Sequence, residues 1–181
     1  MQLVGDEKSM KQQVTILTTG GTIEKSYCES SGSVKNQEPQ LKAMLLSRMR
    51  LPHTDFWIEE IMAKDSLDMK DADRELIAAK IAEHEENQRP IVVLHGTDTM
   101  EKTIQHCYDK MKPKVAVIFT GAMKPAGFVD SDAQQNFTEA LFASQIVPPG
   151  FYISFHGHLF EAPYVRKNHE QGTFEDERFP L

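Results

Sequence analysis

The chain has 181 residues, of which 40% are hydrophobic, and a formal net charge of −7 at pH 7. This length and composition predict one packed domain and exclude a disordered chain or two domains of ordinary size. The acidic balance disfavours attraction to nucleic-acid phosphates, and no apolar run reaches the roughly 18 residues that span a bilayer, so we expect no nucleic acid and no membrane as partner.

Apolar runs of strand length alternate along the chain with segments of helical spacing. The expected strands are residues 14–18, 56–62, 91–94, 115–119 and 151–155. Several are β-branched and apolar on both faces, as is typical of parallel strands covered on both sides. The expected helices are residues 40–49, 71–86, 99–111 and 133–146. This order predicts an α/β fold with an open parallel sheet and helices on both faces, of the flavodoxin or Rossmann type.

The predicted domain organisation is simple. Residues 1–12 are expected to form an N-terminal tail, residues 13–168 the α/β domain, and residues 169–181 a loosely held C-terminal tail. The first eight residues lack the apolar core of a secretory signal, which favours a cytoplasmic protein.

Small polar residues and glycines follow four of the expected strands. The turns are residues 19–22, 65–68, 95–99 and 120–123. Each turn alone is ordinary helix-capping chemistry. Because ligands of such sheets bind beyond the carboxyl ends of the strands, the four turns together predict a binding site at that edge.

A nucleotide site is the first alternative for the Gly20-Gly21 turn. The sequence has neither G-x-x-x-x-G-K-[ST] nor G-x-G-x-x-G at this place. A polar stretch, residues 26–39, separates the turn from the next expected helix, so no helix N-terminus is available for a phosphate. Nucleotide binding is therefore disfavoured.

A reacting hydroxyl is the second alternative. Thr22 follows the glycine pair directly, and Tyr27 follows five residues later. A threonine reacts only where one group takes its proton and another stabilises the oxyanion. Thr97 and Asp98 stand together after the third strand. Asp98 either caps the following helix, which the residues alone favour, or holds a substrate ammonium.

Other candidate sites have plainer explanations. Two cysteines, Cys28 and Cys107, make no disulfide framework, and Cys107 is expected in the core. His156, His158 and Glu161 are a candidate metal site, but a polar strand end is the favoured interpretation. We expect no metal and no other cofactor. Trp57 is expected to be a core residue.

Three blocks in this order resemble the bacterial-type L-asparaginases: residues 19–23, 95–100 and 120–125, followed by a further similar stretch at 130–137. The resemblance extends from residue 13 to about residue 175. It covers only the N-terminal domain of the usual family member. The smaller C-terminal domain, which helps to complete the site of the neighbouring subunit, is therefore expected to be absent, as in a short-chain form or a piece of a longer protein.

The resemblance also implies catalytic roles for individual residues. Thr22 matches the primary nucleophile of the family, and Tyr27 matches its flexible-loop tyrosine. Thr97 and Asp98 match the second threonine and its neighbouring aspartate. Lys167 matches the lysine that partners this threonine, whereas the sequence pattern alone predicts a solvated surface charge at this position. Tyr27 and the Thr97–Lys167 pair are the proton-transfer candidates.

Substrate-binding residues are implied in the same way. Ser66 matches the serine that binds the substrate α-carboxylate, and Gly21 and Gly96 are expected beside the substrate. Gly21 and Thr97 are candidate donors to the oxyanion. Leu67 departs from the family, which usually has a polar residue near the substrate α-amino group at this position.

The activity implied by the resemblance is hydrolysis of L-asparagine to L-aspartate and ammonia through a threonine acyl-enzyme. Leu67 keeps open a related amidase that acts on glutamine or D-asparagine, including glutamine handling of the amidotransferase type. The absent domain keeps open a non-catalytic amino-acid-binding domain. A homodimer or homotetramer in the cytoplasm is expected, with a small amino-acid amide as its ligand.

Overall fold

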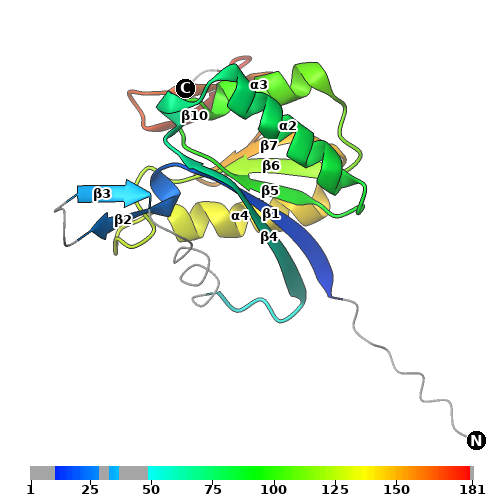
Figure 1. Ribbon diagram of the computed structural model, residues 1–181, viewed down its shortest axis with the longest axis horizontal. Helices are drawn as coiled ribbons and strands as arrows, with labels where there is room; N and C mark the ends of the chain where they lie inside the picture. The colour runs from blue at the N-terminus through cyan, green and yellow to red at the C-terminus, as the bar shows by residue number, and fades with distance from the viewer. Residues whose placement is uncertain (1–10, 29–32, 37–48, 180–181) are drawn as a thin grey trace, which may run out of the picture.

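The computed structural model describes residues 11–28, 33–36 and 49–179, and residues 26–28 and 33–36 by their backbone alone. Its centre is a six-stranded sheet in the order β4-β1-β5-β6-β7-β8 (Figure 1). The strands are β1 (Gln12–Gly20), β4 (Thr54–Lys64), β5 (Ile91–Leu94), β6 (Ala116–Thr120), β7 (Gly150–Phe155) and β8 (His158–Glu161). The first five are parallel, and β8 pairs with β7 in the antiparallel sense. The predicted open parallel sheet is confirmed.

Helices cover both faces of the sheet. The helices α2 (Asp71–Glu85) and α3 (Met100–Lys110) lie on one face, and α4 (Ala133–Ile146) lies on the other (Figure 1). Alternate strand residues supply the two cores: Leu17, Val93 and Phe119 pack with α2 and α3, while Ile16, Val92 and Ile118 pack with α4. Strands buried on both sides explain why their sequences are continuous apolar runs.

Two short hairpins complete the described fold, and neither was expected from the sequence. The first joins β2 (Lys25–Cys28) to β3 (Ser33–Asn36), and the second joins β9 (Val165–Asn168) to β10 (Thr173–Asp176). Strands of four residues contain too few positions for a clear alternation of apolar and polar side chains.

The structure corrects two expectations about packing. The expected C-terminal tail is not loose over residues 173–176, because Phe174 is 1% exposed and packs edge-on against Phe155 with ring centroids 5.1 Å apart. Trp57 is not a core residue but is 58% exposed. It lies on β4, which is the edge strand of the sheet and is covered less completely than the central strands.

Two further expectations concern helices. The helix expected at residues 40–49 lies almost wholly outside the described residues. Within the described ranges, every helix is too short or too polar to span a lipid bilayer.

The strand order creates a switch point between β1 and β5. The chain passes from β1 outward to β4 on one side, and from β5 outward to β6 on the other. Loops that leave two adjacent parallel strands in opposite directions open a crevice at the carboxyl edge of the sheet. The turns after β1 and β5, which include Thr22 and Thr97, meet at this edge.

Candidate active site

Three of the strand ends approach one another through residues without bulky side chains. A Cβ atom placed on Gly21 would lie 2.4 Å from both Cα and N of Gly96. A Cβ atom placed on Gly96 would lie 2.6 Å from Oγ of Ser66. The turns after β1, β4 and β5 therefore touch at this point, and only glycine at both positions permits the contact. We call Gly21, Ser66, Gly96, Thr97, Asp98 and Lys167 the strand-end cluster.

The glycine pair also has a backbone shape that other residues avoid. Gly20 has φ +93° and Gly21 has φ +87°, a region that is costly for residues with a Cβ atom. The Gly21 N–H donates to the carbonyl oxygen of Lys64 at 3.0 Å. This corrects the expectation that the Gly21 amide is an oxyanion donor, because β4 already uses it. The missing side chain of Gly21 instead permits the close contact with Gly96.

The threonines around this turn differ in what their hydroxyl groups do. Thr19 is fully buried, and its hydroxyl donates to the carbonyl oxygen of Leu94 at 2.9 Å, which ties β1 to β5. The Thr18 side chain hydrogen-bonds to the carboxyl group of Glu24. Thr22 begins the short 3-10 turn Thr22–Glu24 and is half-buried. Of the three, Thr22 is therefore the one beyond the strand and beside the strand-end cluster.

A buried lysine joins the turn after β5 to the β9–β10 hairpin. The Nζ atom of Lys167 donates to Oγ1 of Thr97 at 2.9 Å and also to Oδ1 of Asp98. The Lys167 side chain is only 4% exposed, whereas the Asp98 side chain is 40% exposed. A buried ammonium is stable only when it is paired and hydrogen-bonded, and these two contacts meet that condition.

The expectations for Asp98 and Lys167 can now be compared with the structure. The helix α3 is capped at Thr99 and has no side-chain cap, so Asp98 does not serve as one. Lys167 is not the solvated surface charge that the pattern predicts. Along β9, Val165 and Lys167 are buried and Arg166 is exposed. A strand assignment for residues 165–168 would have placed Lys167 on the inner face, but the apolar pattern did not reveal this strand.

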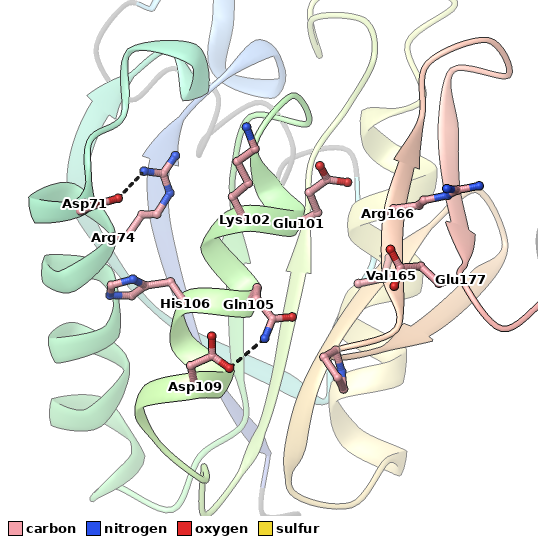
Figure 2. Close-up of a pocket in the computed structure, with 11 residues that line it drawn as sticks. Asp71, Arg74, Glu101, Lys102, Gln105, His106, Asp109, Val165, Arg166 and Glu177 are labelled. Carbon is pink, nitrogen blue, oxygen red and sulfur yellow. Dashed lines mark hydrogen bonds and ion pairs between the residues drawn. The ribbon is translucent and has the colours of Figure 1, made fainter.

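The backbone of Lys167 is held as firmly as its side chain. Its N–H donates to Oε2 of Glu101 on the first turn of α3. Figure 2 shows Glu101 on α3 facing the strand that carries Val165 and Arg166. A cavity of about 640 Å³ lies on this side of the molecule, with Arg74, Glu101, Lys102 and Arg166 among its lining residues. Neither Thr97 nor Lys167 lines this cavity. The cavity is therefore separate from the strand-end cluster and adjoins it through Glu101.

The turn after β6 reaches Thr97 from another side. The Thr97 hydroxyl contacts the sulfur atom of Met123 at 3.6 Å. Met123 is held by Asp132, which accepts from the Met123 N–H at 3.0 Å and from Nε2 of His156 at 3.0 Å. Burial acts to raise the pKa of Asp132, but hydrogen bonds from the backbone amides of Met123 and Lys124 and from His156 outweigh it and lower the pKa. Asp132 therefore stays ionised and positions this turn.

The histidines of the described residues do not form a metal site. His156 contacts Asp132 and, at 3.1 Å, the hydroxyl of Thr173. Within residues 11–28, 33–36 and 49–179, no group of three or more histidine, cysteine, aspartate or glutamate side chains has a geometry that could hold a metal ion. His156 lies in the turn between β7 and β8, and His158 begins β8.

His95 supports the turn after β5 without being available for proton transfer near neutral pH. Burial lowers its pKa to about 4, and the nearby charge of Arg74 acts in the same direction. Nδ1 of the neutral ring donates to the carbonyl oxygen of Gly96 at 2.7 Å. His95 therefore orients the Gly96 backbone from within the core.

The remaining predicted residues lie at the rim or beneath it. Ser66 is 1% exposed under Gly96, and its carbonyl oxygen accepts from the Thr99 hydroxyl at 2.8 Å. Leu67 beside it is 70% exposed. Tyr27 lies in β2, where only its backbone is described, so the position of its phenol stays a prediction. Cys107 is buried as expected, and burial raises the pKa of its thiol to about 12.

Gly21→Ala is expected to lower the free energy of unfolding by at least about 2 kcal/mol, because alanine adds backbone strain at φ +87° and a clash with Gly96. Urea unfolding followed by circular dichroism measures the change. The matched control is Gly127→Ala, since a Cβ atom at Gly127 has no heavy atom within 4 Å. Equal unfolding midpoints for the two variants would contradict the close approach of the two turns.

Comparison with known proteins gives a consistent result. The family model "Asparaginase, N-terminal" matches residues 13–180. L-asparaginase 1 of Escherichia coli (strain K12) is 31% identical over 173 residues, which cover 90% of this chain and 49% of that protein. A glutamyl-tRNA(Gln) amidotransferase component of Methanococcus maripaludis (strain C5) is 32% identical over 177 residues, which cover 90% of this chain and 41% of that protein.

The solved structures agree with the sequence relatives. The thermostable L-asparaginase from Thermococcus kodakarensis superposes with a TM-score of 0.85 at 27% identity. The superposition covers 93% of this chain and 52% of that chain. The chain thus spans about half the length of the relatives that it matches.

Proposed function

The chain belongs to the asparaginase family, in the part that corresponds to the N-terminal domain, and from this premise we propose that it is an amidohydrolase that converts L-asparagine to L-aspartate and ammonia. The observation that carries the proposal is the buried Thr97–Lys167 contact at 2.9 Å, with Asp98 on the same ammonium. A lysine is expensive to bury, and its contact with a hydroxyl at a switch-point crevice supports a catalytic site.

The proposed nucleophile is the hydroxyl of Thr22. The neighbouring Thr19 hydroxyl is committed to Leu94, whereas Thr22 is half-buried at the crevice. In the proposed reaction the Thr22 oxygen bonds to the side-chain amide carbon, the carbon–nitrogen bond breaks, and the protonated nitrogen leaves as ammonia. Water then attacks the ester carbon, aspartate is released, and a proton from this water restores the Thr22 hydroxyl.

Lys167 is proposed to act on the reaction through Thr97. Its ammonium donates to the oxygen of Thr97, so the Thr97 hydroxyl proton points away from Lys167 and toward its next partner, which is Met123 in this structure. A bound substrate or water would replace the weak sulfur acceptor and receive this proton. Thr97 would thereby serve as a proton relay or oxyanion donor for the ester hydrolysis.

Recognition of the amino-acid end of the substrate is proposed to use Asp98, Ser66 and Gly96. The Asp98 carboxylate is 40% exposed and thus keeps acceptor capacity for a substrate ammonium beyond its contact with Lys167. Leu67 offers no polar group to that ammonium and is 70% exposed. Asp98 would therefore carry most of the ammonium recognition supplied by the described residues.

A second candidate function is amide hydrolysis on glutamine, as in the glutamine handling of an amidotransferase. The similarity to the glutamyl-tRNA(Gln) amidotransferase component favours it, at 32% identity, together with the apolar residue at position 67. This candidate uses the same threonine chemistry and differs in the length of the side chain that reaches Thr22.

A panel of amides tests the proposal and separates the two candidates. Purified protein is supplied with L-asparagine, D-asparagine and L-glutamine, and ammonia release gives kcat/KM for each. The asparaginase proposal expects the highest value for L-asparagine, and a preference for L-glutamine would support the second candidate. Calorimetric binding of aspartate without turnover of any amide would contradict both and indicate a binding domain.

Assembly and location stay predictions. A homodimer or homotetramer is the predicted assembly, and light scattering measures the mass in solution. The cytoplasm is the predicted compartment, where a small amino-acid amide would be the substrate.

A further inference from the structure

A carboxyl group lies inside the turn that carries the proposed nucleophile. Oε2 of Glu24 accepts a hydrogen bond from the Gly20 N–H at 2.6 Å. The Glu24 N–H donates to the carbonyl oxygen of Gly21 at 3.1 Å. Glu24 therefore holds the turn that precedes it by two hydrogen bonds: its side chain bonds to Gly20, and its backbone N–H bonds to Gly21.

This contact acts at an irregular point in the sheet. The pairing of β1 with β4 shifts register between Thr18 and Gly20, and the Gly20 N–H donates to the Glu24 side chain. Without the Glu24 carboxyl group, the Gly20 N–H would lack its acceptor, which is costly for a partly buried amide. The turn would then be held less firmly against Gly96, which Gly21 approaches closely.

The surroundings of Glu24 make its carboxyl group sensitive to pH. Burial is the main cause that raises its pKa to about 7, and the charge of Glu60 on β4 adds to the effect. Hydrogen bonds from Gly20 and Thr18 act in the opposite direction but do not outweigh burial. Two lysines with described side chains lie close to Glu24 along the chain or on β4, and both are paired with other carboxylates: Lys25 with Asp65, and Lys64 with Asp73.

We propose that Glu24 is a positioning residue for Thr22, whose carboxyl group fixes the Gly20–Thr22 turn against the turn after β5 and does so most firmly when it is ionised. An N–H bond to a carboxylate is stronger than one to a neutral carboxyl oxygen. Small displacements of a reacting group cost large factors in rate. The inference rests on the proposed function, since it assigns a role in the reaction of Thr22.

Ionisation of the Glu24 carboxyl group is expected to lower the stability of the fold and to raise the activity. A carboxyl group with a raised pKa in the folded state contributes stability that is fully present below about pH 4.5 and is lost as pH rises through about 7. Glu24→Gln avoids burying this charge, so its melting temperature relative to the wild type should rise between pH 5 and pH 8. A merely structural role predicts that activity and stability change together.

The test measures kcat against pH for L-asparagine hydrolysis, with thermal melts of the same samples. We expect wild-type kcat to rise through about pH 7, and Glu24→Gln to equal the wild type near pH 5.5 but to fall about 5- to 10-fold below it at pH 8, with KM little changed. Glu24→Ala loses the acceptor altogether, and its kcat should fall about 10- to 100-fold across the range.

Two charge variants sharpen the experiment. Glu60→Gln removes a charge that adds to the effect of burial on the pKa of Glu24, so the rise in kcat should move slightly to lower pH. The control is Glu83→Gln. Glu83 lies on α2 and contacts Lys80, so its replacement should leave the dependence of kcat on pH unchanged. A shift with Glu60→Gln alone supports the assignment of the titration to Glu24.

Three outcomes overturn the inference. The first is a Glu24→Ala variant with kcat within about twofold of the wild type, and the second is a Glu24→Gln variant that keeps the rise through about pH 7. Either of these two outcomes contradicts the role of Glu24 but leaves the proposed function intact, because the wild type is active in both cases. The third is a wild type that releases ammonia from none of the amides, which overturns the proposed function and this role with it.

Discussion

Thr22→Ala is expected to lower kcat for L-asparagine by about 10⁴-fold or more, because the variant has no oxygen with which to form the acyl-enzyme. Gly21 and Ile23 fix the backbone of the turn, so loss of the hydroxyl should leave the fold intact. Ile23 is fully buried and packs in the core under α4. Ammonia release under saturating asparagine measures the effect, and circular dichroism checks the fold.

Two controls separate chemistry from structure. Thr22→Ser keeps the hydroxyl and should retain a measurable fraction of the rate. Thr19→Val removes the hydroxyl that donates to the Leu94 carbonyl at 2.9 Å, so it should lose about 1 kcal/mol of stability while keeping kcat. If Thr22→Ala kept wild-type activity, or if Thr19→Val lost it instead, the proposed nucleophile would be wrong.

Lys167→Met should lower kcat by about 10²- to 10⁴-fold with a well-formed fold. Methionine fills most of the buried space that the lysine stem occupies, but it cannot donate to Thr97 or neutralise Asp98. Removal of one partner leaves the Asp98 carboxylate without its cation, and its 40% exposure lets water compensate in part. Activity should therefore fall much more than stability.

Arg166→Met is the matched control for this position. Arg166 is the adjacent cation on β9, but its side chain is 52% exposed and contacts Glu175 at 2.6 Å, away from Thr97. The variant should keep kcat within about threefold, since it touches none of the strand-end cluster. A larger loss of kcat in Arg166→Met than in Lys167→Met would contradict the assignment of the lysine.

Central elements of the fold were predictable because their sequence signals are long and strong. The runs that became β1, β5, β6 and β7 are apolar on both faces, and burial between two helical layers requires that. Of the two edge strands, β4 was predicted at residues 56–62 and β8 was not. Trp57 looked like core because it is apolar, yet its strand lies at the edge of the sheet.

The candidate site divides along a similar line. Thr22, Thr97 and Asp98 follow strands, so their position at the carboxyl edge could be inferred from chain order. Asp98 could not be distinguished from a helix cap until Lys167 was found against it. Glu24 carries no sequence signal of a role, because a carboxylate two residues after a threonine forms no recognisable motif.

By itself, the sequence determined the alternation of strands and helices, the family resemblance and the edge of the sheet at which polar residues gather. These features depend on local patterns and on chain order, which are visible in one dimension. Tertiary structure decided which polar groups share one environment: it buried Lys167 against Thr97, used the Gly21 amide for β4, and enclosed the Glu24 carboxyl group beside Thr18 and Glu60. Burial and contacts between residues about 70 positions apart arise only when the sheet closes, and they set the charge and orientation on which the proposed chemistry depends.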